Sequence, residues 1–133
     1  MKIIDIICKI IFCLIIAMPI LGALGIFPEP TADLYNTPEA FAFIQALSET
    51  KYILYINAIV FAASIILLIT GRTALAALLV LPITVNVVAF HLFLDGGLLT
   101  PGAIMADVML FLNLYFLWQS RTRYLPLWVK SSI

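Results

Sequence analysis

Four runs of apolar residues, each about long enough to cross a lipid bilayer, make up most of this chain. They cover residues 3–27, 52–70, 74–94 and 103–119. A spanning helix needs about 20 mainly apolar residues, because the hydrocarbon core of a bilayer is about 30 Å thick. Open strands are excluded in lipid, since their backbone groups would lack partners. The sequence therefore predicts an all-α protein, a bundle of four transmembrane helices.

Composition favours the same fold class. Of the 133 residues, 65% are hydrophobic and 11% are charged, whereas a soluble domain is about half apolar and about a quarter charged. A soluble fold of this size buries only about two-thirds of its unfolded surface, so it could not hide this much apolar side chain from water. We expect a single membrane domain over residues 1–133 with the lipid bilayer as its surroundings. No basic run suits nucleic acid, so none is expected as a partner.

The first apolar run, residues 3–27, allows two interpretations. Lys2 before an apolar core, with small residues at the far end, is typical of a cleaved signal peptide. The apolar stretch is longer than the usual signal core, however, and its small residues do not form a clean A-x-A site. We therefore expect a retained helix, kinked at Pro19.

The polar segment between the first two runs contains a short amphipathic helix at residues 38–49. Thr37 can cap its start, Pro38 is tolerated at the first helical position, and Glu39 suits the positive helix end. Apolar residues then recur at helical spacing, at Ala40, Phe43, Ile44 and Leu47. Two roles remain open for this helix: it lies on the membrane surface or plugs the end of the bundle, or it serves as a lid or docking face for a partner.

Basic residues predict the orientation of the bundle. Six of the seven fall on one side, namely Lys2, Lys9, Arg72, Arg121, Arg123 and Lys130. Lys51 falls on the other side, with most of the acidic residues. The positive-inside rule then places both termini in the cytoplasm and turns the amphipathic helix outward.

Five polar residues inside the spans are the candidate ligand-binding residues: His91, Asp107, Asn57, Asn86 and Asn113. At about 1.5 Å of rise per residue, the first three lie about 6–8 Å below the outer end of the bundle, and the last two lie near its middle. Ionisable residues in spans rarely face lipid. We therefore expect His91 to pair with Asp107, with Asn57 close by. Asn86 is expected to hydrogen-bond Asn113.

Packing between helices and a binding role both remain open for this polar layer. The catalytic residues are unknown, since there is no serine nucleophile with a base and no phosphate loop. The layer offers too few ligands for a metal site, and Cys8 and Cys13 are interpreted as packing residues. No cofactor is required. Haem is poorly supported, because the single histidine supplies at most one axial ligand.

Several segments together resemble the DoxX-like family of small bacterial membrane proteins. They are AFIQAL in the amphipathic helix, the Gly71-Arg72 turn, LPITVNVVAFHLFLD, and LNLYFLW. The resemblance is most specific at Pro82, Asn86, Phe90, His91 and residues 113–115. It implies a four-helix fold in the bacterial inner membrane. It also implies a link to quinol oxidation and thiosulfate:quinone oxidoreduction, with quinone as the cofactor to consider.

The chain departs from that family in the helix at residues 52–70. Close members carry a basic residue and a glutamate in its first half. Here the segment reads NAIVFAAS, so Asn57 stands near the basic position and Phe61 replaces the acid. The expected function is therefore a non-catalytic accessory or assembly subunit of a redox-linked membrane complex, with partner subunits or further copies of itself. A quinone-binding subunit is the alternative, and a transport or solute-binding bundle ranks lowest, since no internal repeat is present.

Overall fold

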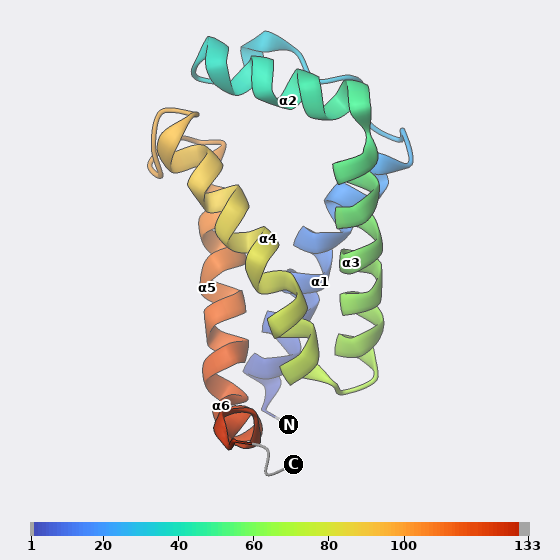
Figure 1. Ribbon diagram of the computed structural model, residues 1–133, viewed down its shortest axis with the longest axis vertical. Coiled ribbons are helices and arrows are strands. Elements are labelled where there is room, and N and C mark those ends of the chain that lie inside the picture. Colours follow the sequence, from blue (N-terminus) through green and yellow to red (C-terminus); the bar gives the residue numbers. More distant parts are fainter. Residues whose placement is uncertain (1, 131–133) are drawn as a thin grey trace.

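The computed structural model describes residues 2–130, and this part of the chain is helical with no strand (Figure 1). The elements in chain order are α1 (Ile3–Ala23), η1 (Ala32–Leu34), α2 (Pro38–Thr50), α3 (Tyr52–Ile69), α4 (Thr73–Phe93), α5 (Ala103–Gln119), α6 (Arg121–Tyr124) and η2 (Leu125–Trp128). The all-α prediction is confirmed. Three described helices, α1, α3 and α4, are long and apolar enough to cross a membrane; α5 joins them as a fourth if it is counted with the segment Arg121–Trp128, to which it is bent by 68°.

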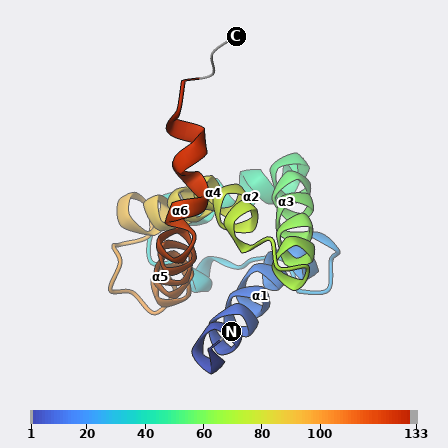
Figure 2. The same cartoon turned by 90° about the horizontal axis from the view of Figure 1, so that it is seen from below.

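The long helices form a closed arrangement around one apolar core. α1 packs on α3, α3 on α4 and α4 on α5, and contacts between α1 and α5 complete the ring (Figure 2). The large apolar side chains removed from solvent are Phe12, Ile16, Phe61, Val80 and Phe116. The rings of Phe12 and Phe116 meet across α1 and α5, with centroids 5.5 Å apart. Ala76 and Ala77 are fully buried and allow the α4 backbone close approach, as small residues do in membrane bundles.

Local sequence explains where α1 and α2 begin and end. α1 ends at Ala23 rather than at the expected residue 27, because the chain turns at Gly25, which has a φ of 74°. α2 begins at Pro38, and the Thr37 hydroxyl accepts a hydrogen bond from the Ala40 amide at 3.1 Å. The predicted capping by Thr37 is thus confirmed. α2 lies across one end of the bundle, crosswise to the long helices (Figure 1).

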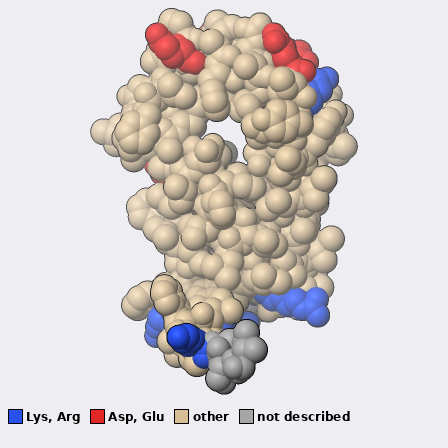
Figure 3. Space-filling view, in the orientation of Figure 1, with Lys and Arg blue, Asp and Glu red and all other residues tan. Residues whose placement is uncertain are grey.

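The two ends of the molecule differ in charge. On the face shown in Figure 3, basic side chains gather at the end that holds both termini, which we call the terminal end, and acidic side chains gather at the end covered by α2, the α2 end. Many large apolar side chains on the outside of the bundle are exposed, including Ile59, Ile69 and Phe111. Such an apolar belt between two polar ends suits a surrounding of lipid. Figure 3 also shows an opening beneath α2.

Candidate functional site

His91 does not pair with Asp107, contrary to the prediction. Its Nδ1 atom lies 2.9 Å from Oδ2 of Asp95 instead. Residues four apart share a helix face, and the turn after Phe93 brings the Asp95 carboxylate back beside the imidazole. Because a carboxylate can only accept, Nδ1 carries the proton in this contact and Nε2 is the nitrogen left for other partners.

The expected hydrogen bond between Asn86 and Asn113 is also absent. Asn113 is fully buried, and its Nδ2 donates to the Ala77 carbonyl on α4 at 3.0 Å. Its Oδ1 has no hydrogen-bond donor among residues 2–130. Asn86 is exposed because Thr84 occupies the inner face of α4, and two residues along a helix turn the side chain by about 200°.

The other two candidates, Asp107 and Asn57, form no hydrogen bond with His91 or Asn113. Asp107 is half-buried on α5 and forms no hydrogen bond or ion pair with another residue of the described range. Asn57 is half-buried and lines a groove between the end of α1 and the start of α3. The five predicted residues therefore do not form one polar layer, although each remains a candidate for binding on its own.

A hydrogen-bonded network at the α2 end involves a residue that the sequence did not single out, Asn36. The Asn36 amide N–H donates to Oδ1 of Asp95 at 2.8 Å, and the Asn36 Nδ2 donates to the Asp95 carbonyl at 3.1 Å. The Thr37 hydroxyl donates to the Leu94 carbonyl. Asp95 is only 1% exposed. This α2-end network, made of Asn36, Thr37, His91 and Asp95, ties the start of α2 to the end of α4.

A glycine and a group of aromatic rings pack around the α2-end network. Gly96 has a φ of 87°, and a Cβ there would lie 3.3 Å from the Asn36 Cβ, so the loop requires glycine. Tyr35 packs edge-on against Phe90, with centroids 6.4 Å apart, and Phe43 stacks on Phe90 at 5.8 Å. Burial, and then the nearby Asp95 carboxylate, raise the pKa of Tyr35 above its ordinary value.

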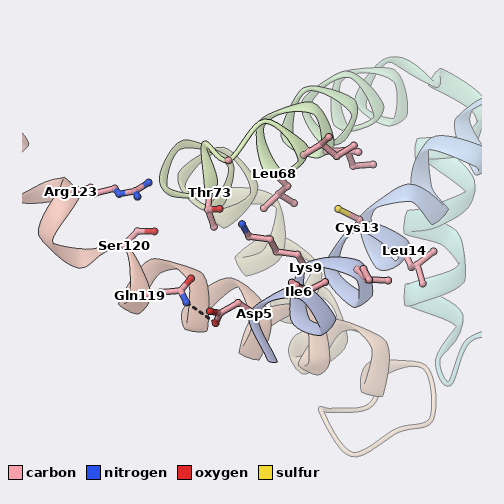
Figure 4. A pocket seen from close by; sticks show the side chains of 14 residues that line it. Asp5, Ile6, Lys9, Cys13, Leu14, Leu68, Thr73, Gln119, Ser120 and Arg123 are labelled. Atoms are coloured by element: carbon pink, nitrogen blue, oxygen red, sulfur yellow. Dashed lines mark hydrogen bonds between the residues drawn. The ribbon is translucent and has the colours of Figure 1, made fainter. Parts of the chain in front are cut away.

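A groove of about 730 Å³ lies at the terminal end, between α1, α3 and the junction of α5 with α6 (Figure 4). Its polar lining consists of Asp5, Lys9, Thr73, Gln119, Ser120 and Arg123. Asp5 is the best-connected of these residues. Its Oδ1 accepts from the Tyr115 hydroxyl and, at 2.8 Å, from Gln119 Nε2, and its Oδ2 accepts from the Lys2 amide at 3.2 Å.

Sequence reasoning missed this groove, although one signal for it was visible. Asp5 is an acid inside an apolar run, and Tyr115 and Gln119 are four residues apart, so they share one face of α5. An acid in a spanning segment needs donors, and these two side chains supply them.

Comparison of the chain with protein-family models, with curated proteins and with solved structures found no match. Within residues 2–130, no three or more His, Cys, Asp or Glu side chains are grouped so as to hold a metal ion. Function therefore has to be inferred from the chain's own geometry.

Proposed function

We propose that this protein is a non-catalytic accessory or assembly subunit of a membrane complex. The observation that carries the proposal is Asp107, an ionisable side chain within an apolar helix that has no hydrogen-bond or ion-pair partner in the described range. A carboxylate in a spanning helix is costly, by about 2.5–3.5 kcal/mol at the bilayer centre, unless it meets a partner or water. A donor from a neighbouring subunit would offset that cost.

Asn86 supports the same proposal from the neighbouring helix. It is an exposed amide in the middle of α4 that can make up to four hydrogen bonds, with only lipid expected beside it. Amide side chains on membrane helices commonly hydrogen-bond across to another helix. Asn86 and Asp107 lie on helices that pack together, and we propose each of them as a contact for a partner subunit.

We further place this subunit in the bacterial inner membrane, with both termini in the cytoplasm. The support is the gathering of Lys and Arg at the terminal end, together with the resemblance to the DoxX-like family at Pro82, Asn86, Phe90 and His91. That resemblance also makes a redox-linked complex the first kind of partner to seek.

Co-purification from native membranes in mild detergent tests the subunit proposal. Asp107→Leu is expected to reduce the amount of co-purified partner at least about tenfold, because a hydrogen bond to a charged group contributes about 1.5–3 kcal/mol. Ile59→Leu, at an exposed apolar position on α3 and not on the α4–α5 surface, is the control and should retain the partner. Isolation of the wild-type protein only as a monomer or as copies of itself would contradict the proposal.

A quinone-binding subunit is the second candidate, favoured by the His91–Asp95 pair. A buried carboxylate fixes the tautomer of the imidazole, which leaves Nε2 able to accept from a quinol hydroxyl or, when protonated, to donate to a quinone carbonyl. The ring of Phe90, whose centroid is 5.1 Å from that of His91, offers an apolar surface beside the imidazole.

Mass spectrometry of lipids extracted from the purified protein tests this second candidate. We expect about one quinone per chain in the wild type and at least a tenfold loss in His91→Phe, with unchanged helix content by circular dichroism. Tyr52→Phe, at an exposed position on α3, serves as the control. Absence of quinone from the wild-type extract would reject the candidate.

A further inference from the structure

We propose that the groove at the terminal end binds one anionic phospholipid, with the headgroup phosphate between Lys9 and Arg123 and an acyl chain along α1 and α3. This site is separate from the α4–α5 surface proposed for a partner subunit. It does not depend on which complex the protein joins.

The groove has an apolar wall on which an acyl chain can pack. It consists of Ile6, Ile10, Cys13, Leu14, Ile65, Leu68 and Ile69. Ile10 and Leu14 on α1 and Ile69 on α3 are more than half exposed, so the groove opens on the outer surface of the bundle. A lipid can therefore enter sideways from the bilayer. The volume of about 730 Å³ lies within the range of about 300–1,000 Å³ typical of ligand sites.

The polar part of the groove suits a phosphate. Figure 4 shows the Lys9 side chain extending from α1 toward Thr73, with Arg123 of α6 beyond Thr73 and close to Ser120. Thr73 and Ser120 are buried hydroxyl-bearing residues. Two cations and two hydroxyls from three separate elements match the several acceptor oxygens of a phosphodiester.

Among the described residues that line the groove, Asp5 is the one acid. It accepts hydrogen bonds from Tyr115, Gln119 and the Lys2 amide. The described residues of the lining therefore include two basic side chains and one acid, a net positive charge. This net charge favours an anionic headgroup over a zwitterionic one.

The pairing of charge and apolar wall distinguishes a phospholipid from other occupants. A free phosphate would use Lys9 and Arg123 but leave the wall of α1 and α3 uncovered. A neutral quinone would use the wall but not the cations. Basic pockets between spanning helices on the cytoplasmic side are a recurrent place for anionic lipid headgroups, and the terminal end is the one rich in Lys and Arg.

Binding of phosphatidylglycerol to delipidated protein in a neutral detergent, followed by native mass spectrometry, tests the proposal. Lys9→Gln and Arg123→Gln should each weaken binding about fivefold, and the double variant about 25-fold, because a basic residue near an anionic lipid contributes about 1 kcal/mol. Arg123 is exposed on α6, so the binding measured with Arg123→Gln still tests the proposal if Lys9→Gln does not fold.

Two control variants separate the groove from general surface charge. Arg121 is also on α6, but its guanidinium lies 4.6 Å from the centroid of the Trp118 ring and does not line the groove. Lys51 lies at the α2 end. Arg121→Gln and Lys51→Gln should stay within twofold of the wild type. An equal loss in Arg121→Gln would overturn the proposal.

Two ligand controls identify the source of the phosphate. Phosphatidylcholine, which is zwitterionic, should bind at least fivefold more weakly than phosphatidylglycerol. Inorganic phosphate at the same concentration should not displace the lipid. Equal binding of phosphatidylcholine, or full displacement by inorganic phosphate, would show that the groove does not select an anionic phospholipid.

Discussion

Asp95→Ala is expected to lower the free energy of unfolding by about 2–5 kcal/mol. Asp95 is buried and accepts hydrogen bonds from the Asn36 amide and from Nδ1 of His91. Each donor left without a partner in a buried place costs about 1–3 kcal/mol. The alanine variant loses both acceptors, and the contact that holds α2 over the end of α4 weakens.

Asp95→Asn should lower the free energy of unfolding by less than half as much as Asp95→Ala does. The amide has nearly the same shape, and its oxygen can still accept from Asn36. Its Nδ2 can donate to Nδ1 of His91 if the imidazole proton moves to Nε2. The difference between the two variants therefore measures the hydrogen bonds rather than the volume of the side chain.

Thermal or denaturant unfolding in one detergent measures these changes. Hydrogen exchange of residues 36–50 should rise in Asp95→Ala before the long helices open, because the α2-end network is local. Asp33→Ala is the matched control, since Asp33 is an exposed acid at the same end. It should change stability by less than about 0.5 kcal/mol. Equal stabilities of Asp95→Ala and Asp33→Ala would contradict the role given to the network.

Much of the fold could be predicted because its signals are local. Long apolar runs give α1, α3, α4 and α5, and the turn Gly71-Arg72 between α3 and α4 is too short for anything but antiparallel neighbours. The cap at Thr37 is read from three consecutive residues. These features depend on the properties of each segment, so a single sequence is enough to find them.

The contacts of the predicted polar layer could not be predicted, because depth along a helix is only one of two coordinates. The rise per residue placed Asn86 and Asn113 at one depth in the bundle. It does not say in which direction each side chain points from its helix axis: Asn113 is buried, whereas Asn86 is exposed. His91 finds Asp95 because the following loop folds back on α4, and Asn36 joins from a segment 59 residues away. Loop paths of this kind depend on tertiary packing, which periodicity does not report.

Asp5→Ala is expected to lower the midpoint of thermal unfolding by several degrees Celsius, because it removes hydrogen bonds at the terminal end of the molecule. Asp5 joins the start of α1 to the end of α5, since it accepts from Tyr115 and Gln119. These two residues are 110 and 114 positions away in the sequence, so the contact closes the ring of helices. In the variant, a phenolic hydroxyl and a side-chain amide lose their acceptor at the edge of the bundle.

A double-mutant cycle with Tyr115→Phe separates this contact from general damage. Tyr115→Phe removes only the hydroxyl and keeps the ring, whose centroid lies 5.3 Å from that of Phe116. This variant alone should lower the unfolding midpoint, because the hydrogen bond to Asp5 is lost. In the Asp5→Ala background the same change should have less than half of that effect, because the acceptor is already gone. Tyr55→Phe, at an exposed position on α3, is the control for loss of a hydroxyl. Additive effects of Asp5→Ala and Tyr115→Phe would mean that the two side chains stabilise the protein independently, and that α1 is held to α5 by apolar packing alone.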